Sequence, residues 1–85
     1  MNPHFASLVM GLAAQAEAAL EGRLPPGIDA IPEPQLRQMA QALIDTLGML
    51  EEKTRGHLGA DEARLLAEAL TQVRFRFVQT GSASH

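Results

Sequence analysis

Apolar residues recur along the middle of the chain with the spacing of an α-helix. Over residues 34–55 they follow one another in alternating steps of four and three, which places them on one side of a helix. Gly56 comes next, and glycine readily adopts the left-handed backbone conformation that closes many helices. The pattern predicts a helix over residues 34–55. Its expected core stripe is Leu36, Ala40, Leu43, Leu47 and Leu50.

The same periodicity returns over residues 60–79, which predicts another helix. Asp61 and Glu62 open this segment, where acidic side chains interact favourably with the amides and dipole of a first turn. The intervening turn is short, so the two helices are expected to form an antiparallel αα-hairpin with facing stripes. Residues 81–85 offer nothing to bury and are expected to form a flexible tail. The stripe of this helix is Leu66, Leu70, Val73 and Phe77.

A helix is also predicted over residues 3–21, and it is apolar or small on nearly every face. Pro3 suits the first turn and Gly22 suits the C-terminal cap. Glu17 and Glu21 are the only charged residues in this segment. A helix that is apolar all round is normally a buried one. Its large residues form the expected core stripe, which is Phe5, Leu8, Val9, Leu12, Ala16 and Leu20.

A row of small residues backs that stripe and forms most of a candidate interface. Small side chains let two helix backbones approach closely, which favours burial of this row against another copy of the chain. The alternative is that Ala14 and Ala18 are simply good helix formers on a solvated face. Met49 and Phe75 join the candidate interface because each lies off the core stripe of its helix. The candidate interface is therefore Ser7, Gly11, Ala14, Ala18, Met49 and Phe75.

The first two helices are joined by a proline-rich connector at residues 22–33, which excludes a regular helix or a central strand there. Ile28 and Ile31 are expected to pin this stiff connector to the core. Residues 1–80 then form a single helical domain. We expect an all-α fold of three helices, completed as a helical bundle by self-association.

Composition supports a small helical protein. Alanine and leucine dominate the 85 residues, and only three are aromatic, all of them phenylalanine, which favours helix over sheet. A chain of this length buries a thin core unless an oligomer adds to it. The absence of cysteine excludes disulfides and zinc–thiolate sites, and it fits a reducing compartment.

The expected location is the cytoplasm. The longest apolar stretch, Phe5–Ala14, has about half of the roughly 20 residues needed to cross a bilayer. It is followed by Ala14-Gln15-Ala16, which is similar to the small-x-small cleavage site of a signal peptide. The basic residues that normally precede the apolar part of a signal peptide are missing. We therefore expect neither export nor a membrane association.

No catalytic constellation emerges from the sequence. His4, His57 and His85 are dispersed and lack metal-ligand spacing, and no serine has a neighbouring base in a recognisable nucleophile motif. The expectation is a protein that is not an enzyme and that uses no metal or cofactor.

An alternative function is suggested by Arg74-Phe75-Arg76-Phe77. Alternating basic and aromatic residues are used to bind single-stranded nucleic acids. The candidate contacts to a polyanion are Arg64, Arg74 and Arg76. The formal net charge of −3 argues against this function, because it provides no strong field that attracts nucleic acid.

The stretch Leu43–Gly56, which reads LIDTLGMLEEKTRG, and the following Glu62–Leu66 resemble a short bacterial family catalogued as domain of unknown function 1844. Phe5–Ala13 and Val73–Val78 are similar to the two ends of that family, so the resemblance covers nearly the whole chain. It implies a compact helical bacterial protein and brings no established activity.

The chain departs from the family pattern at three positions. His57 stands where asparagine is usual, Gly59 where threonine is usual, and Phe77 where tyrosine is usual. Because the usual asparagine and tyrosine are replaced, these departures argue against a role for a side-chain amide in the turn or for a phenol near the C-terminus. No catalytic residue is carried over from the family. The leading hypothesis is a cytoplasmic helical interaction module that forms a homodimer or a higher homo-oligomer, with a further protein partner as an open possibility.

Overall fold

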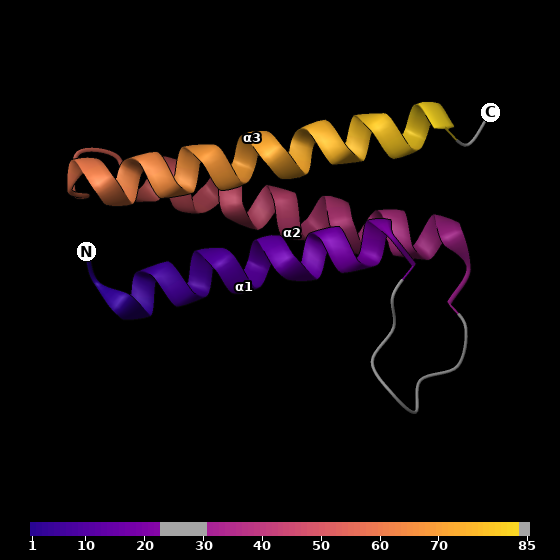
Figure 1. The fold of residues 1–85 in the computed structure, drawn as a ribbon, viewed down its shortest axis with the longest axis horizontal. Coiled ribbons are helices and arrows are strands. Elements are labelled where there is room, and N and C mark those ends of the chain that lie inside the picture. Colours follow the sequence, from indigo (N-terminus) through magenta and orange to yellow (C-terminus); the bar gives the residue numbers. More distant parts are fainter. Residues whose placement is uncertain (23–30, 84–85) are drawn as a thin grey trace.

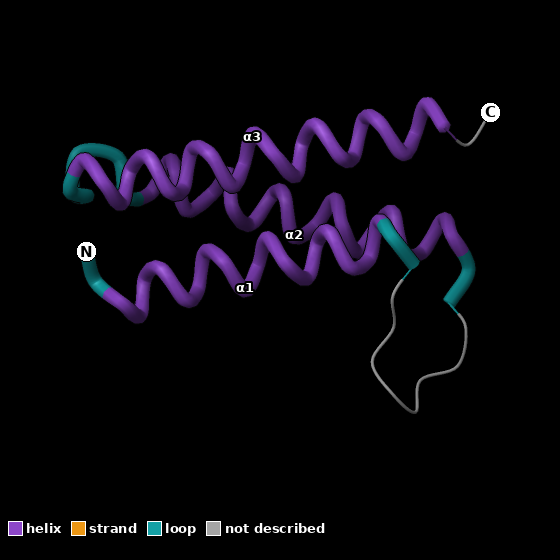
Figure 2. The backbone as a smooth tube through the Cα atoms, viewed as in Figure 1, coloured by secondary structure: helices purple, strands orange, loops and turns teal. Residues whose placement is uncertain are grey.

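Three helices pack side by side in the computed structural model, which describes residues 1–22 and 31–83. They are α1 (Pro3–Leu20), α2 (Glu33–Lys53) and α3 (Ala60–Ala83), and each packs against the other two. Helices α1 and α3 run in the same direction, and α2 runs in the opposite one (Figure 1). The described residues contain no strand (Figure 2). The predicted all-α fold of three helices is therefore confirmed.

Local interactions explain where α1 begins and ends. The side-chain Oδ1 of Asn2 accepts hydrogen bonds from the backbone N–H groups of His4 and Phe5, at 2.8 and 3.2 Å. These bonds satisfy two amides that have no partner within the helix. Pro3 occupies the first turn, and Gly22 follows the helix with a φ of 73°. Both predicted boundary residues are confirmed, whereas the capping role of Asn2 was not anticipated.

The turn between α2 and α3 is closed by a glycine at one end and a glutamate at the other. Helix α2 ends at Lys53, two residues before its predicted end at residue 55, and Thr54 is its C-terminal cap. Gly56 lies in the turn that follows, and its φ of 83° is the left-handed conformation predicted for it. The Oε1 atom of Glu62 accepts a hydrogen bond from the backbone N–H of Gly59 at 3.2 Å. This contact is one half of a capping box, and the glycine lacks the side chain that forms the other half.

The Gly56→Ala variant is expected to lower the free energy of unfolding by about 1–2 kcal/mol, since an L-residue is strained at a positive φ. Urea denaturation followed by circular dichroism measures this loss. Gly48→Ala is the matched control, because Gly48 lies within α2 and an added Cβ atom would meet only the Arg74 side chain, at 3.5 Å. It is expected to stabilise the protein by up to about 1 kcal/mol through helix propensity. Equal effects of both substitutions on the free energy of unfolding would contradict the requirement for a positive φ at Gly56.

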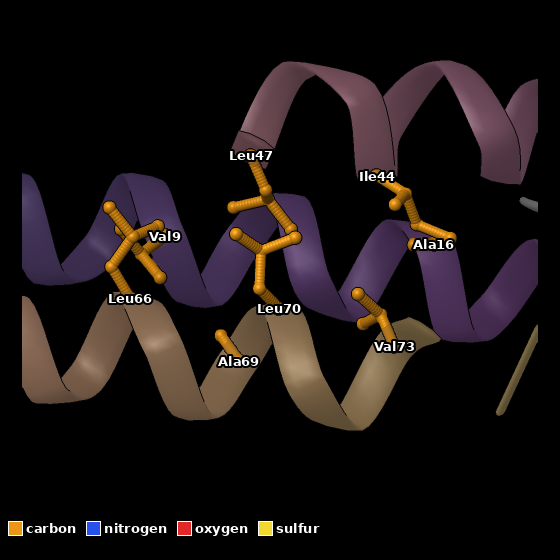
Figure 3. Close-up of a cluster of buried hydrophobic side chains, with 8 residues drawn as sticks. All are labelled: Val9, Ala16, Ile44, Leu47, Leu66, Ala69, Leu70 and Val73. Atoms are coloured by element: carbon orange, nitrogen blue, oxygen red, sulfur yellow. The ribbon is translucent and has the colours of Figure 1, made fainter. Parts of the chain in front are cut away.

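All three helices contribute to one hydrophobic core (Figure 3). The side chains of Leu47, Leu66 and Leu70 are essentially inaccessible to solvent. They belong to the stripes predicted for α2 and α3, so the facing of these two stripes is confirmed. The central cluster is Val9, Ala16, Ile44, Leu47, Leu66, Ala69, Leu70 and Val73.

The prediction that Leu8 belongs to the core is wrong, because its side chain is 49% exposed. Val9 is fully buried, and the preceding residue of a helix points about 100° away from it. That rotation places Leu8 at the edge of the buried side of α1. Ala19, which was not assigned to the core, is buried instead.

The C-terminal helix, α3, continues to Ala83, past its predicted end at residue 79. Residues 81–83 are thus helical, although a tail was expected from residue 81. Extension of an existing helix adds a hydrogen bond for each residue that becomes ordered, and no proline stops it. In the connector, Ile31 is half-buried, which agrees with the predicted anchoring. Ile28 lies outside the described residues.

Candidate functional site

The row of small residues predicted on the first helix lies on the side of α1 that faces away from the core. Successive side chains of a helix are rotated by about 100° around its axis. On this basis the four side chains of the row lie within an arc about 60° wide, on the side of α1 opposite Val9. A Cβ atom added to Gly11 would meet nothing within 4 Å outside its own part of the helix. Neither α2 nor α3 therefore covers the row at Gly11. Ser7 and Ala14 are exposed, and Gly11 and Ala18 are half-buried.

A groove runs between α1 and α3 beside this row. Its volume is about 290 Å³, and Ala14 of the small row forms part of its wall. Met10 stands at its edge with 54% of its surface exposed. Glu17 and Glu68 place one carboxylate on each side. The groove is lined by Met10, Ala13, Ala14 and Glu17 of α1 and by Leu65, Glu68, Ala69, Gln72 and Val73 of α3.

Phe75 is the large exposed side chain next to this groove. It lies on α3 with 64% of its surface accessible to solvent. A shallow, mainly apolar depression beside its ring shares Glu68 and Gln72 with the groove, so the two surfaces are continuous. We call the combined surface the α1–α3 face. Its main residues are Met10, Ala14, Glu17, Leu65, Glu68, Gln72 and Phe75. The other small residues of the row, Ser7, Gly11 and Ala18, adjoin it on the outer side of α1.

Met49 does not belong to the α1–α3 face. It is 45% exposed on α2, and it follows the fully buried Leu47 by two residues, or about 200° of helix rotation. Its side chain therefore points away from the core, on the side of α2 that is remote from α1 and α3. The six candidate interface residues therefore do not share one surface: Ala14 and Phe75 belong to the α1–α3 face, Ser7, Gly11 and Ala18 adjoin it on α1, and Met49 lies on the opposite side of the molecule.

Of the residues that line the groove, only Ala14 was a candidate interface residue in the sequence; Met10, Glu68 and Gln72 are among those that were not anticipated. Each is separated from its neighbours across the groove by tens of residues. The exposed position of Met10 has a local signal, since it follows Val9 directly and is rotated by about 100° from it. Glu68 and Gln72 have no comparable signal. They become part of a site only because α3 packs alongside α1.

The three arginines proposed as polyanion contacts are not brought together. Arg76 lies on the α1 side of α3, where its Nη2 is 3.5 Å from the Oε1 of Glu21. Arg74 extends over α2, with its Nη2 3.5 Å from the position of a Cβ atom on Gly48. Arg64 lies ten residues before Arg74, or about 15 Å along the helix. These positions do not form one basic surface.

Residues 1–22 and 31–83 include no group of three histidine, cysteine, aspartate or glutamate side chains that is able to hold a metal ion. Within the same ranges, no helix has the length and apolar character required to cross a bilayer.

Comparison with known proteins identifies a family and no individual relative. Neither a curated protein nor a solved structure matches the chain. The profile of a domain of unknown function, DUF1844, matches residues 2–79, a range that includes all three predicted segments and both edges of the groove. The expected resemblance is thus confirmed, and the protein belongs to the DUF1844 family.

Proposed function

We propose that this protein is a small cytoplasmic interaction module that self-associates through the α1–α3 face. The observation that carries the proposal is the uncharged outer side of α1. No charged side chain occurs between Phe5 and Ala16, although Met10, Ser7 and Ala14 in this stretch are exposed. Apolar surface rimmed by polar groups is typical of interaction sites. No enzymatic activity or cofactor is part of the proposal.

A second copy of the chain suits this face better than a strongly charged partner. A two-fold dimer brings the same patch of both subunits together, so the patch must be complementary to itself. The outer side of α1 satisfies this requirement between Phe5 and Ala16, because it carries no charge there and two copies of it do not repel one another. Association also enlarges the buried core, which is thin in a chain of 85 residues.

Sedimentation velocity across the micromolar range tests this function. The wild-type protein is expected to shift from monomer to dimer or higher oligomer as its concentration rises. A strict monomer that retains stable helicity at every concentration would overturn the proposal.

Gly11→Leu is expected to weaken self-association by about 10- to 100-fold, since overpacking a close contact costs about 1–3 kcal/mol. The protomer itself has room for the new side chain, because an added Cβ atom meets nothing within 4 Å. Circular dichroism should therefore show an unchanged or more stable helix. A variant that associates as tightly as the wild type would place the interface away from the small row.

A further inference from the structure

The core stripe of α3 continues into a polar residue. Phe77 is its last apolar member, and the next position of the stripe is Thr80, which is half-buried. Between them, Val78 is 66% exposed. We call residues 78–83 the C-terminal arm. Among the arm residues whose side chains the structure describes, 78–80, none is a buried apolar residue, so packing in the core does not hold the arm in place.

Arg37 of α2 holds the arm through polar contacts instead. Its Nη1 donates a hydrogen bond to the Oγ1 of Thr80 at 3.0 Å, and its Nη2 donates one to the backbone carbonyl oxygen of Phe77 at 3.3 Å. The guanidinium carbon also lies over the ring of Phe77, 4.0 Å from its centroid, in the geometry of a cation–π contact. This one side chain therefore links the beginning of α2 to the end of α3.

The acceptors of Arg37 are both neutral, whereas a guanidinium forms its strongest hydrogen bonds with anionic oxygens. Within residues 1–22 and 31–83, no carboxylate forms a salt bridge with Arg37. Glu33 precedes Arg37 by four residues on α2, which is the favoured order for an ion pair on a helix surface. An alternative acceptor is thus available to the guanidinium when the arm is released.

A cavity of about 290 Å³ adjoins this contact, where the end of α1 meets the beginning of α2. Arg37 and Thr80 both line it, together with the buried Ala19 and Leu36. We infer that the C-terminal arm is a lid on this cavity that opens by local unwinding, with Arg37 as its latch. Segments with few buried apolar contacts open at a lower free energy than the core does. The inference does not depend on the proposed self-association.

Hydrogen–deuterium exchange followed by mass spectrometry tests the latch. Arg37→Ala removes the two hydrogen bonds and the ring contact, and α2 should persist because arginine and alanine have similar helix propensities. The amides of the arm are expected to exchange about 10-fold faster, as for the loss of hydrogen bonds to a charged group. Exchange in Leu66–Val73 should not change. Gln38→Ala is the matched control, since Gln38 is exposed on the same helix, and should leave the arm as in the wild type.

An apolar residue at the last stripe position should have the opposite effect. Thr80→Leu continues the core stripe by one position, and the adjoining cavity provides room for the larger side chain. Exchange in the arm is expected to slow by about 5-fold, because the new side chain is buried only when the arm is closed. Faster exchange in Thr80→Leu, an unchanged arm in Arg37→Ala, or equal acceleration along the whole of α3 would overturn the inference.

Thiol labelling tests whether the arm covers the cavity, since the natural chain has no cysteine. Ala19→Cys places a small thiol at a buried position that lines the cavity. Its reaction with dithiobis(nitrobenzoate) is expected to become about 10-fold faster when Arg37→Ala is added, because labelling follows the population of the open form. Ala16→Cys is the control for unfolding of the bundle, since Ala16 is fully buried and does not line the cavity. No acceleration at Ala19→Cys, or equal acceleration at both positions, would overturn the assignment of the arm as a lid.

Discussion

The Leu70→Ala variant is expected to lose about 2–5 kcal/mol of unfolding free energy, the range for truncation of a buried leucine to alanine. The side chain of Leu70 is 1% exposed and belongs to the cluster that joins all three helices (Figure 3). Its removal leaves a cavity that the rigid surrounding helices fill only in part. Domains are stable by only about 5–15 kcal/mol in total. Urea denaturation and thermal melting, both followed by circular dichroism, measure the loss.

Leu8→Ala is the matched control for this truncation, because it removes the same atoms from a side chain that is half exposed. It is expected to cost less than about 1 kcal/mol, as most substitutions outside a core do. Both variants are best compared at one protein concentration, since self-association adds a concentration-dependent contribution to apparent stability. A loss for Leu8→Ala equal to that for Leu70→Ala would restore Leu8 to the core stripe that helical periodicity predicted.

The Ala14→Glu variant is expected to weaken self-association by about 100-fold or more. In a two-fold dimer it introduces two carboxylates into the α1–α3 face, and an unpaired charge buried at an interface costs about 2–5 kcal/mol. Ala14 is exposed in the protomer and lies in the wall of the groove. The substitution should therefore leave the folded monomer intact. Sedimentation equilibrium gives the dissociation constant, and circular dichroism reports the fold.

Ala42→Glu is the matched control. It adds the same charge at a different position and so tests whether the position of the charge matters. Ala42 is also exposed within a helix, but it lies on α2 and does not line the groove. Glutamate at this position is expected to leave the dissociation constant within a few-fold of the wild-type value. Equal weakening by both variants would show that net charge, rather than the α1–α3 face, governs association.

The sequence by itself determined that there are three helices and placed the start of each to within one residue, because the forces that act there are local. Pro3, Gly22 and Gly56 act through their own backbone preferences, and the core stripes of α2 and α3 follow from periodicity alone. The same local logic identified Phe75 and the small row as outward-facing. It failed at Leu8, because an apolar residue at the edge of a stripe is buried only if a neighbouring helix reaches it.

Only the tertiary structure decided which outward-facing residues share a surface. Met10 and Gln72 lie on one groove because α1 and α3 are parallel neighbours, and no pattern within either helix encodes that contact. The same packing places Phe75 beside the groove and separates it from Met49, although the sequence treats both as equivalent exposed residues. Periodicity specifies the direction of a side chain relative to its own helix, whereas a binding surface depends on the position and rotation of the helices relative to one another.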